Sequence, residues 1–365
     1  MVLNSKLVLG LDRGVKFILL SASLITVLTG CGININSTDT TSTNSIGGLF
    51  FSESKGDKWA KRSAIMGTTQ VSSFSGADVW TFVVDPSDRK ALYVGTQADG
   101  LFFSLDSGAG WQHSNSLGSV FVRSIAIDPQ FSCTLYVTVT NKLLKSVDCT
   151  RTWQTVYVDN DQAVTINSVV VDPKNGSKIY IATSRGEVLK SVDRGNAWQA
   201  AYRIQGKIAK LFINPKNVQN IYASSDKFGL SVTTNSGSTW DTLDKQLTTF
   251  DDSVLFKDMS FSGLDVNRIF IATRYGLLRT DNGGKNWSKI DLITPKDKAT
   301  INALAVNPQN DLELYYVTNS TFYRSVDGGK TWKAMELPTS RIGSTLTVDS
   351  RVPNWLFMGV REIKK

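Results

Sequence analysis

Three features of this 365-residue sequence predict an all-β fold, a seven-bladed β-propeller with one blade closed by N- and C-terminal strands. A motif of the form Ser-x-Asp-x-Gly-x-x-Trp recurs at intervals of about 45 residues. Between its copies, short runs rich in β-branched and aromatic residues, such as LYVGT and GLFFSLD, alternate with turn residues. Finally, each end of the chain carries only half of a repeat. Four short strands per repeat of this length are typical of a propeller blade.

The repeated motif is expected to build a turn between the third and fourth strands of each blade. Its Asp can accept backbone N–H bonds, its Gly permits a positive φ, and its Trp covers the turn with a large aromatic surface. Asn can accept the same bonds and replaces Asp in two copies. The positions expected to be structural are Asp106, Trp111, Asp148, Trp153, Asp193, Trp198, Asn235, Trp240, Asn282, Trp287, Asp327 and Trp332.

This motif resembles the Asp-box, or BNR, repeat of sialidases, sortilin-type receptors, xyloglucanases and photosystem assembly propellers. Among these, the chain is most similar to the photosystem II assembly and stability propellers, and the resemblance spans residues 47–360 through the repeat alone. It implies a single exported ring that binds a partner without enzymatic activity and that is lipid-anchored in some lineages.

The two chain ends are expected to complete one blade together. The first motif copy, GLFFSESKGDKW, has no preceding inner strand, whereas STLTVDS and WLFMGV at the C-terminal end have no motif after them. Pairing these halves removes exposed strand edges. An open or six-bladed ring is the alternative, and it would leave both halves unpaired.

The N-terminal 30 residues have the form of an export signal, because Lys16 precedes a short apolar run from Phe17 to Leu28. The following Leu28-Thr29-Gly30-Cys31 resembles the lipobox of bacterial lipoproteins, which implies acylation of Cys31. We therefore expect a lipoprotein signal at 1–30, a Ser/Thr/Asn-rich tether at 31–46 and the propeller at 47–365. The protein would be lipid-anchored to a membrane of the bacterial cell envelope. Gly32 after the cysteine favours the outer membrane in a diderm host. An ordinary cleaved signal or a short anchor is the alternative.

Two further cysteines, Cys133 and Cys149, flank a predicted hairpin that turns near Asn141. They would lie almost opposite each other at its open end, and an exported protein meets an oxidising compartment. The sequence therefore predicts a disulfide between them, with two free thiols as the alternative.

The sequence offers little for catalysis. It has one histidine, His113, and no clustered metal ligands or phosphate-binding motif, so we expect no metal, no cofactor and no catalytic residue. The net charge of +8 is spread along the chain without a Lys/Arg block, which argues against nucleic acid. Glycoside hydrolysis needs an acid and a base or nucleophile facing one sugar. That chemistry remains the alternative function because several Asp-box proteins perform it.

The inner strands should line a central channel, with polar side chains where each strand begins. Counting five residues back from the Asp/Asn-Pro pair that ends an inner strand gives Trp80, Arg123, Asn167 and Asn302. Lys257 is the aligned position in the repeat that lacks the proline, and Lys210 and Asp258 lie one residue further along their strands. These seven are the candidate binding residues. Residues 241–256 form a longer insert that is expected to overhang the same rim. The prediction is a non-catalytic scaffold that binds a protein or glycan partner here. The alternative is that these residues only hydrate the channel.

Overall fold

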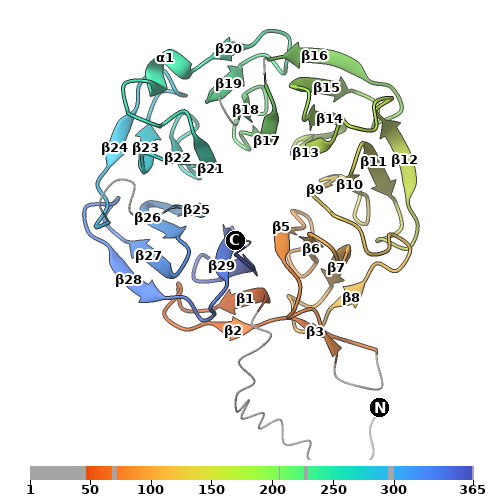
Figure 1. Ribbon diagram of the computed structural model, residues 1–365, viewed down its shortest axis with the longest axis horizontal. Helices are drawn as coiled ribbons and strands as arrows, with labels where there is room; N and C mark the ends of the chain where they lie inside the picture. Colours follow the sequence, from red (N-terminus) through yellow and green to blue (C-terminus); the bar gives the residue numbers. More distant parts are fainter. Residues whose placement is uncertain (1–46, 68–71, 205, 226–228, 295–299, 364–365) are drawn as a thin grey trace, which may run out of the picture. The chain divides into compact units, whose positions relative to one another are not determined.

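The described residues form a closed ring of seven four-stranded antiparallel sheets, as the repeat predicts (Figure 1). The structure, a computed structural model, describes residues 47–67, 72–204, 206–225, 229–294 and 300–363. The expected signal peptide, the lipidation site Cys31 and the tether lie outside these residues. Within the described ranges, no helix is both long and apolar enough to cross a bilayer.

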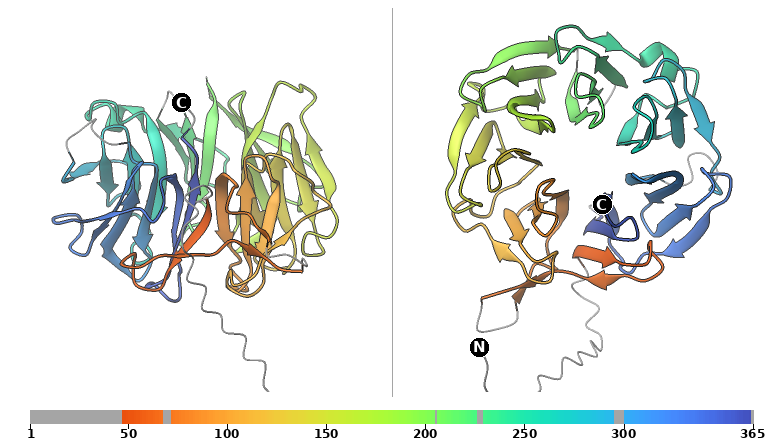
Figure 2. Two further views of the ribbon diagram at one scale, coloured as in Figure 1. Left: turned by 60° about the horizontal axis from the view of Figure 1, so that its bottom comes forward. Right: turned by 180° about the vertical axis from the view of Figure 1, so that it is seen from behind.

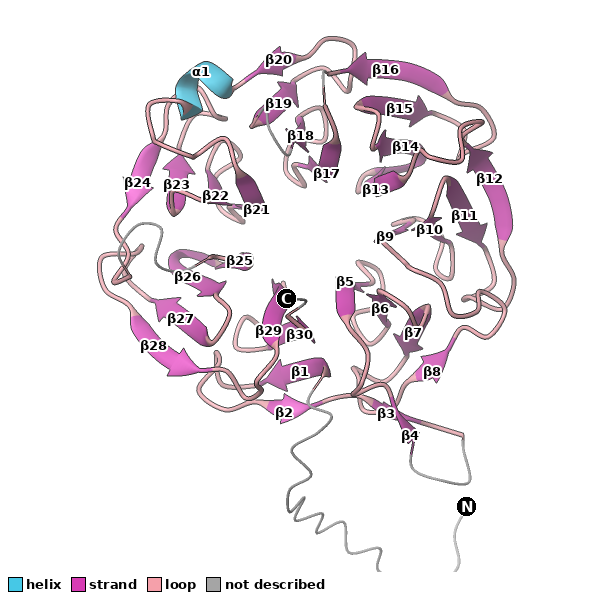
Figure 3. Cartoon of the chain, viewed as in Figure 1, coloured by secondary structure: helices cyan, strands magenta, loops and turns pink. Residues whose placement is uncertain are grey.

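Each blade begins with an inner strand at the channel and ends with an outer strand at the rim (Figure 3). Blade 1 contains β5 (Val79–Val84), β6 (Leu92–Thr96), β7 (Leu101–Ser104) and β8 (Gln112–His113). Blade 2 contains β9 (Ser124–Ile127), β10 (Leu135–Val139), β11 (Lys142–Ser146) and β12 (Gln154–Val158). Blade 3 contains β13 (Ile166–Asp172), β14 (Asn175–Thr183), β15 (Glu187–Ser191) and β16 (Gln199–Arg203).

The second half of the ring repeats this order. Blade 4 contains β17 (Ile208–Ile213), β18 (Ile221–Ser225), β19 (Leu230–Thr233) and β20 (Asp241–Thr242). Blade 5 contains β21 (Phe256–Phe261), β22 (Ile269–Thr273), β23 (Leu277–Thr280) and β24 (Ser288–Ile290). Blade 6 contains β25 (Ala303–Asn307), β26 (Asn310–Val317), β27 (Thr321–Ser325) and β28 (Lys333–Glu336).

Blade 7 combines the two ends of the chain, which confirms the predicted closure. Its strand order is β29 (Ile342–Val348), β30 (Leu356–Arg361), β1 (Gly48–Ser52) and β2 (Ala60–Lys61). Strands β1 and β30 pair antiparallel, with Phe51 opposite Phe357 and their ring centroids 5.0 Å apart. In Figure 2 the red-orange N-terminal strands lie beside the blue C-terminal ones. The open and six-bladed alternatives are therefore wrong.

The turn after the third strand has the same hydrogen bond in all seven blades. The side-chain oxygen at the acidic position accepts the backbone N–H four residues later, at 2.9–3.0 Å, and Ser54 does so in the degenerate first copy. In the third copy, the hydroxyl and backbone N–H of Thr152 also donate to Asp148 and lower the pKa of that carboxyl to about 2. The carboxylate of the motif Asp therefore already accepts hydrogen bonds from its own turn.

A second bond ties each motif turn to the chain between the first two strands of its blade or to the start of the second strand. The residue after the acidic position donates its N–H to a carbonyl there, and its φ is positive in every blade. The donor and acceptor pairs are Lys55–Asn354, Ser107–Lys90, Cys149–Cys133, Arg194–Ser177, Ser236–Gln219, Gly283–Asn267 and Gly328–Leu312.

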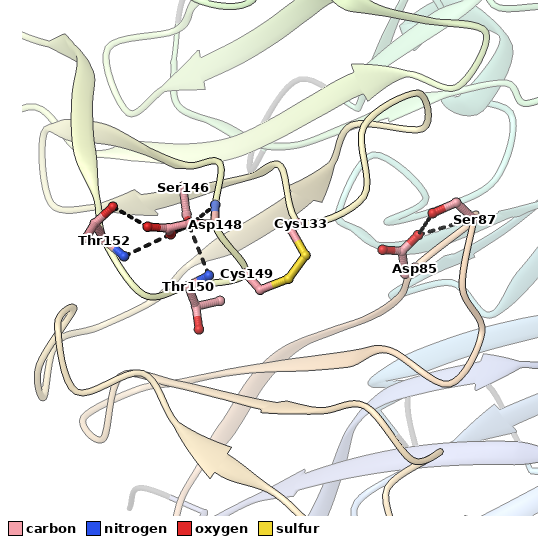
Figure 4. The surroundings of a disulfide bond; sticks show 8 residues. All are labelled: Asp85, Ser87, Cys133, Ser146, Asp148, Cys149, Thr150 and Thr152. Carbon is pink, nitrogen blue, oxygen red and sulfur yellow. Dashed lines mark hydrogen bonds between the residues drawn. A yellow bond between two sulfur atoms is a disulfide. The ribbon is translucent and has the colours of Figure 1, made fainter.

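The disulfide occupies one of these seven equivalent positions. Cys133 and Cys149 are bonded, with their Cα atoms 4.0 Å apart, beside the hydrogen-bonded turn of Asp148 (Figure 4). This is the turn in which Thr150 replaces the motif glycine at a φ of 72°. Two successive non-glycine residues, Cys149 and Thr150, therefore adopt the left-handed region, which is costly for residues with a side chain. The disulfide therefore lies in the motif turn in which two successive residues with side chains have a positive φ.

The motif tryptophans also join neighbouring blades, a role that the sequence did not predict. The indole N–H groups of Trp153, Trp198 and Trp332 donate to acceptors in the preceding blade at 3.1, 3.0 and 2.8 Å. These tryptophans are only partly buried. Trp111 is fully buried, because the connection from blade 7 to blade 1 forms a hairpin, β3 (Ala64–Ile65) and β4 (Ser72–Ser73), whose first strand pairs with it.

The insert at 241–256 does not overhang the channel as expected. It contains β20 and the short helix α1 (Asp244–Leu247), which lies at the outer edge of the ring in Figure 1. Leu243 and Leu247 are buried in the apolar cluster of blades 4 and 5. Burial of these leucines outweighs exposure at the rim, so only Phe256 of the insert reaches the channel pocket.

Candidate functional site: the channel mouth

A pocket of about 400 Å³ opens where the inner strands begin. All seven predicted binding residues line it: Trp80, Arg123, Asn167, Lys210, Lys257, Asp258 and Asn302. They come from six different blades, so the ring brings together side chains that are far apart in the sequence. The four counted residues reach the pocket because each lies five positions before the Asp or Asn that ends its inner strand.

A β-bulge directs side chains into the mouth. The pairing of the first and second strands shifts register at the same place in five blades, around Trp80, Asn167, Ala209, Lys257 and Ser344. A bulged residue is left unpaired and its side chain is re-aimed. This places a variable, polar-rich position at the channel entrance on an otherwise regular strand.

One side of the mouth carries alternating cationic and aromatic groups. The guanidinium carbon of Arg361 lies 5.2 Å from the ring centroid of Trp80, and Trp80 packs edge-to-face on Phe121 with centroids 4.9 Å apart. The guanidinium carbon of Arg123 in turn lies 4.1 Å from the ring centroid of Phe121. Burial lowers the pKa of Arg123 from its usual value, although the side chain stays cationic near neutral pH. We call Arg361, Trp80, Phe121 and Arg123 the cation–aromatic ladder.

The other side of the mouth is held by hydrogen bonds between blades. The carboxylate of Asp258 accepts the backbone N–H of Leu304 at 3.0 Å and pairs with the ammonium of Lys210 at 3.1 Å. The amide of Asn167 donates to the carbonyl of Ile208 at 2.7 Å. These three predicted residues therefore fix the inner strands relative to one another.

Lys257 is exposed at the mouth, and Asn302 is partly buried there. The amide of Asn302 donates to the side chain of Asn319 at 3.0 Å. The mouth is thus cationic, with Arg123, Lys210, Lys257 and Arg361 lining it. Among the described residues that line the pocket, Asp258 carries the sole carboxylate.

Sequence reasoning missed Arg361, Phe121 and Ser344. Ser344 occupies the counted position in blade 7, before Asp349, and the rule overlooked it because no proline follows that Asp. Arg361 ends a second strand and Phe121 lies in the connection between blades, so neither occupies a repeat position that a spacing rule could find.

The described part of the chain contains no cluster of three or more His, Cys, Asp or Glu side chains that could hold a metal ion. His113 lies on β8, where its ring nitrogens contact the side chain of Asn115 and the carbonyl of Asp99 at 2.8 and 2.9 Å. The arrangement can bind an anionic or aromatic group, and it presents no acid and base pair.

The fold and the repeated turn define an Asp-box (BNR) seven-bladed propeller. The family described as photosynthesis system II assembly factor YCF48 matches residues 219–352 of this chain. No curated protein sequence matches the chain.

Solved structures similar to this chain include both enzymes and assembly factors. The GH74 xyloglucanase from Xanthomonas campestris has a TM-score of 0.63 and is 18% identical, covering 83% of this chain and 52% of its own. The structure of YCF48 bound to D1 peptide has a TM-score of 0.61 at 16% identity, covering 78% of this chain and 93% of its own. YCF48 from Cyanidioschyzon merolae has a TM-score of 0.59 at 16% identity, covering 78% and 95%. The chain thus spans about half the length of the xyloglucanase.

Proposed function

We propose that this protein is a lipid-anchored, non-catalytic binding propeller of the bacterial cell envelope. Its channel mouth binds an anionic segment of a protein partner. The observation that carries the proposal is that three members of the cation–aromatic ladder, Trp80, Arg123 and Arg361, line one pocket together with Lys210 and Lys257. Guanidinium groups match carboxylates bidentately, and aromatic side chains add contact area at low entropic cost.

The character of the mouth disfavours the alternative, a glycoside hydrolase. That reaction needs two carboxyl groups about 5–10 Å apart across the sugar. The lone carboxylate among the described mouth residues, Asp258, is already engaged by Leu304 and Lys210. The similarity to the xyloglucanase concerns the fold, over about half of that enzyme's length. The YCF48 complex, in which a propeller binds a peptide, supports a protein segment as the partner class.

The first prediction concerns the mouth. We expect wild-type protein to capture a partner from detergent-solubilised membranes, and Arg123→Glu to lose it because the substitution puts a negative charge in the pocket. Arg203→Glu is the matched control, since Arg203 is on the outer strand β16 and its side chain is 67% exposed. Mass spectrometry of the captured fractions gives the readout. A partner retained by Arg123→Glu, or turnover of an oligosaccharide panel without any captured protein, would contradict the proposal.

The second prediction concerns the anchor. We expect Cys31→Ser to release the protein from the membrane fraction, because acyl chains on one cysteine supply the anchoring free energy, roughly 0.8 kcal/mol per buried CH₂. Membrane fractionation and mass spectrometry of the mature N-terminus test this. Cys133→Ser is the control and should remain in the membrane fraction. Equal retention of both variants would exclude Cys31 as the lipidation site.

A further inference from the structure

Arg361 belongs to the last strand of the chain and yet reaches the channel mouth. It is the final residue of β30 and lines the pocket beside Trp80 of blade 1. The ladder therefore crosses the junction between the closing blade and blade 1. Its two guanidiniums, on Arg361 and Arg123, cap opposite ends of the aromatic pair Trp80 and Phe121.

Each of these guanidiniums has one donor that no described protein group accepts. The Nε atoms of Arg123 and Arg361 are buried and have no hydrogen-bond partner among the described residues. A guanidinium that stacks on an aromatic ring uses its flat face and keeps its N–H donors at the edge. Leaving such a buried donor unpaired is costly, so a ligand oxygen at this place would be favoured.

The position of Arg361 depends on the junction being closed. The next residue, Glu362, donates its backbone N–H to Asp78 at 2.7 Å, and the same carboxylate pairs with Arg341 at 2.7 Å. Ser344 donates to the carbonyl of Val79 at 2.7 Å. These bonds hold β29 and β30 against β5. If they open, Arg361 leaves Trp80.

We infer that Arg361 is a binding residue of the channel mouth and forms an anion clamp with Arg123. The site is complete only when the chain ends have closed the ring. The inference rests on the proposed function and specifies its ligand as a peptide segment with neighbouring carboxylates. Because the clamp exists only in the closed ring, binding stabilises the closure by mass action.

The test measures binding of fluorescein-labelled pentaglutamate to the full-length, detergent-solubilised protein by anisotropy, with pentaglutamine as the uncharged probe. Arg361→Gln should weaken pentaglutamate binding by about tenfold or more, as should Arg123→Gln, since each removes a charge-assisted contact. Arg361→Lys should retain part of the affinity for pentaglutamate, because lysine keeps the positive charge. It should not retain all of it, because an ammonium group cannot make the bidentate contact of a guanidinium. Arg203→Gln should bind as the wild type does.

Hydrogen exchange tests the coupling to closure. Pentaglutamate should slow exchange of the β1 and β30 amides in the wild type and in Arg203→Gln, and should leave it unchanged in Arg361→Gln. Wild-type affinity in Arg361→Gln, with loss in Arg123→Gln, would overturn this inference and leave the proposed function standing. Equal binding of pentaglutamate and pentaglutamine by the wild type would overturn the proposed function itself. If Arg361→Gln does not fold, wild-type affinity in Arg361→Lys would overturn the bidentate clamp.

Discussion

Replacing Trp111 by alanine is expected to lower the free energy of unfolding by about 3–5 kcal/mol, as for other fully buried tryptophans. Its side chain is 0% exposed and lies edge-to-face on Phe74, with centroids 5.3 Å apart. Its backbone N–H donates to Ala64 at 2.9 Å, and its carbonyl accepts from Met66 at 2.8 Å. Removing the indole leaves a cavity between blade 1 and the β3–β4 hairpin. Chemical denaturation of the purified protein measures the change.

Trp287 is the matched control for this substitution. It occupies the same motif position in blade 5, and its indole N–H, like that of Trp111, is buried without a partner among the described residues. The Trp287 side chain as a whole is only partly buried, and no hairpin of the described residues covers it. Trp287→Ala should therefore cost clearly less than Trp111→Ala. If the two substitutions lowered the free energy of unfolding equally, the contact of Trp111 with the β3–β4 hairpin would contribute nothing to stability.

Replacing Phe357 by alanine is expected to cost a similar amount, about 3–5 kcal/mol, and to act on the ring closure. Phe357 is 2% exposed and packs against Phe51 of β1 and Phe82 of blade 1, with centroids 5.0 and 5.1 Å away. The substitution thus removes contacts on both sides of the closing strand. Denaturation gives the overall loss, and hydrogen exchange should show faster exchange in β1 and β30.

Phe131→Ala provides the comparison for Phe357. Phe131 is 53% exposed on a loop of blade 2, so its loss should change stability by less than about 0.5 kcal/mol. If Phe357→Ala lowered the free energy of unfolding as little as Phe131→Ala does, or sped exchange evenly in all blades, either result would contradict a specific role of Phe357 in the ring closure.

The fold was predictable because its physical requirements recur. Every blade needs a turn in which a side-chain oxygen accepts a backbone N–H four residues later, and Asp106, Asn235 and Ser54 all meet that need. The closure followed from two half-repeats, each of which would leave an unpaired edge. By contrast, the β3–β4 hairpin and helix α1 each occur once among the described residues. No repeat in the sequence could therefore predict them, and tertiary packing decides where they lie.

The gathering of the candidate residues in one pocket was predictable from the same repeat. Trp80, Arg123 and Asn167 lie at the same distance before the Asp that ends their inner strands, and all three line one pocket. The spacing of the repeat could not show which of the candidate side chains already bond to a neighbouring blade. Asp258 and Asn167 bond to neighbouring blades, and only the assembled ring shows those acceptors and donors. Arg361 reaches the pocket from a second strand, outside any repeated position.

The closure of the ring by opposite chain ends is tested most directly by a new cross-link at an equivalent position. Lys55 and Asn354 share the backbone bond that Cys149 and Cys133 share in blade 2, at 2.9 and 3.2 Å respectively. The double variant Lys55→Cys/Asn354→Cys should form an intramolecular disulfide on mild oxidation, identified by mass spectrometry of the linked peptides. Lys90→Cys/Ser107→Cys, the same pair within blade 1, is the control. A control that cross-links while the 55–354 pair stays reduced, or links only between molecules, would contradict the closed ring.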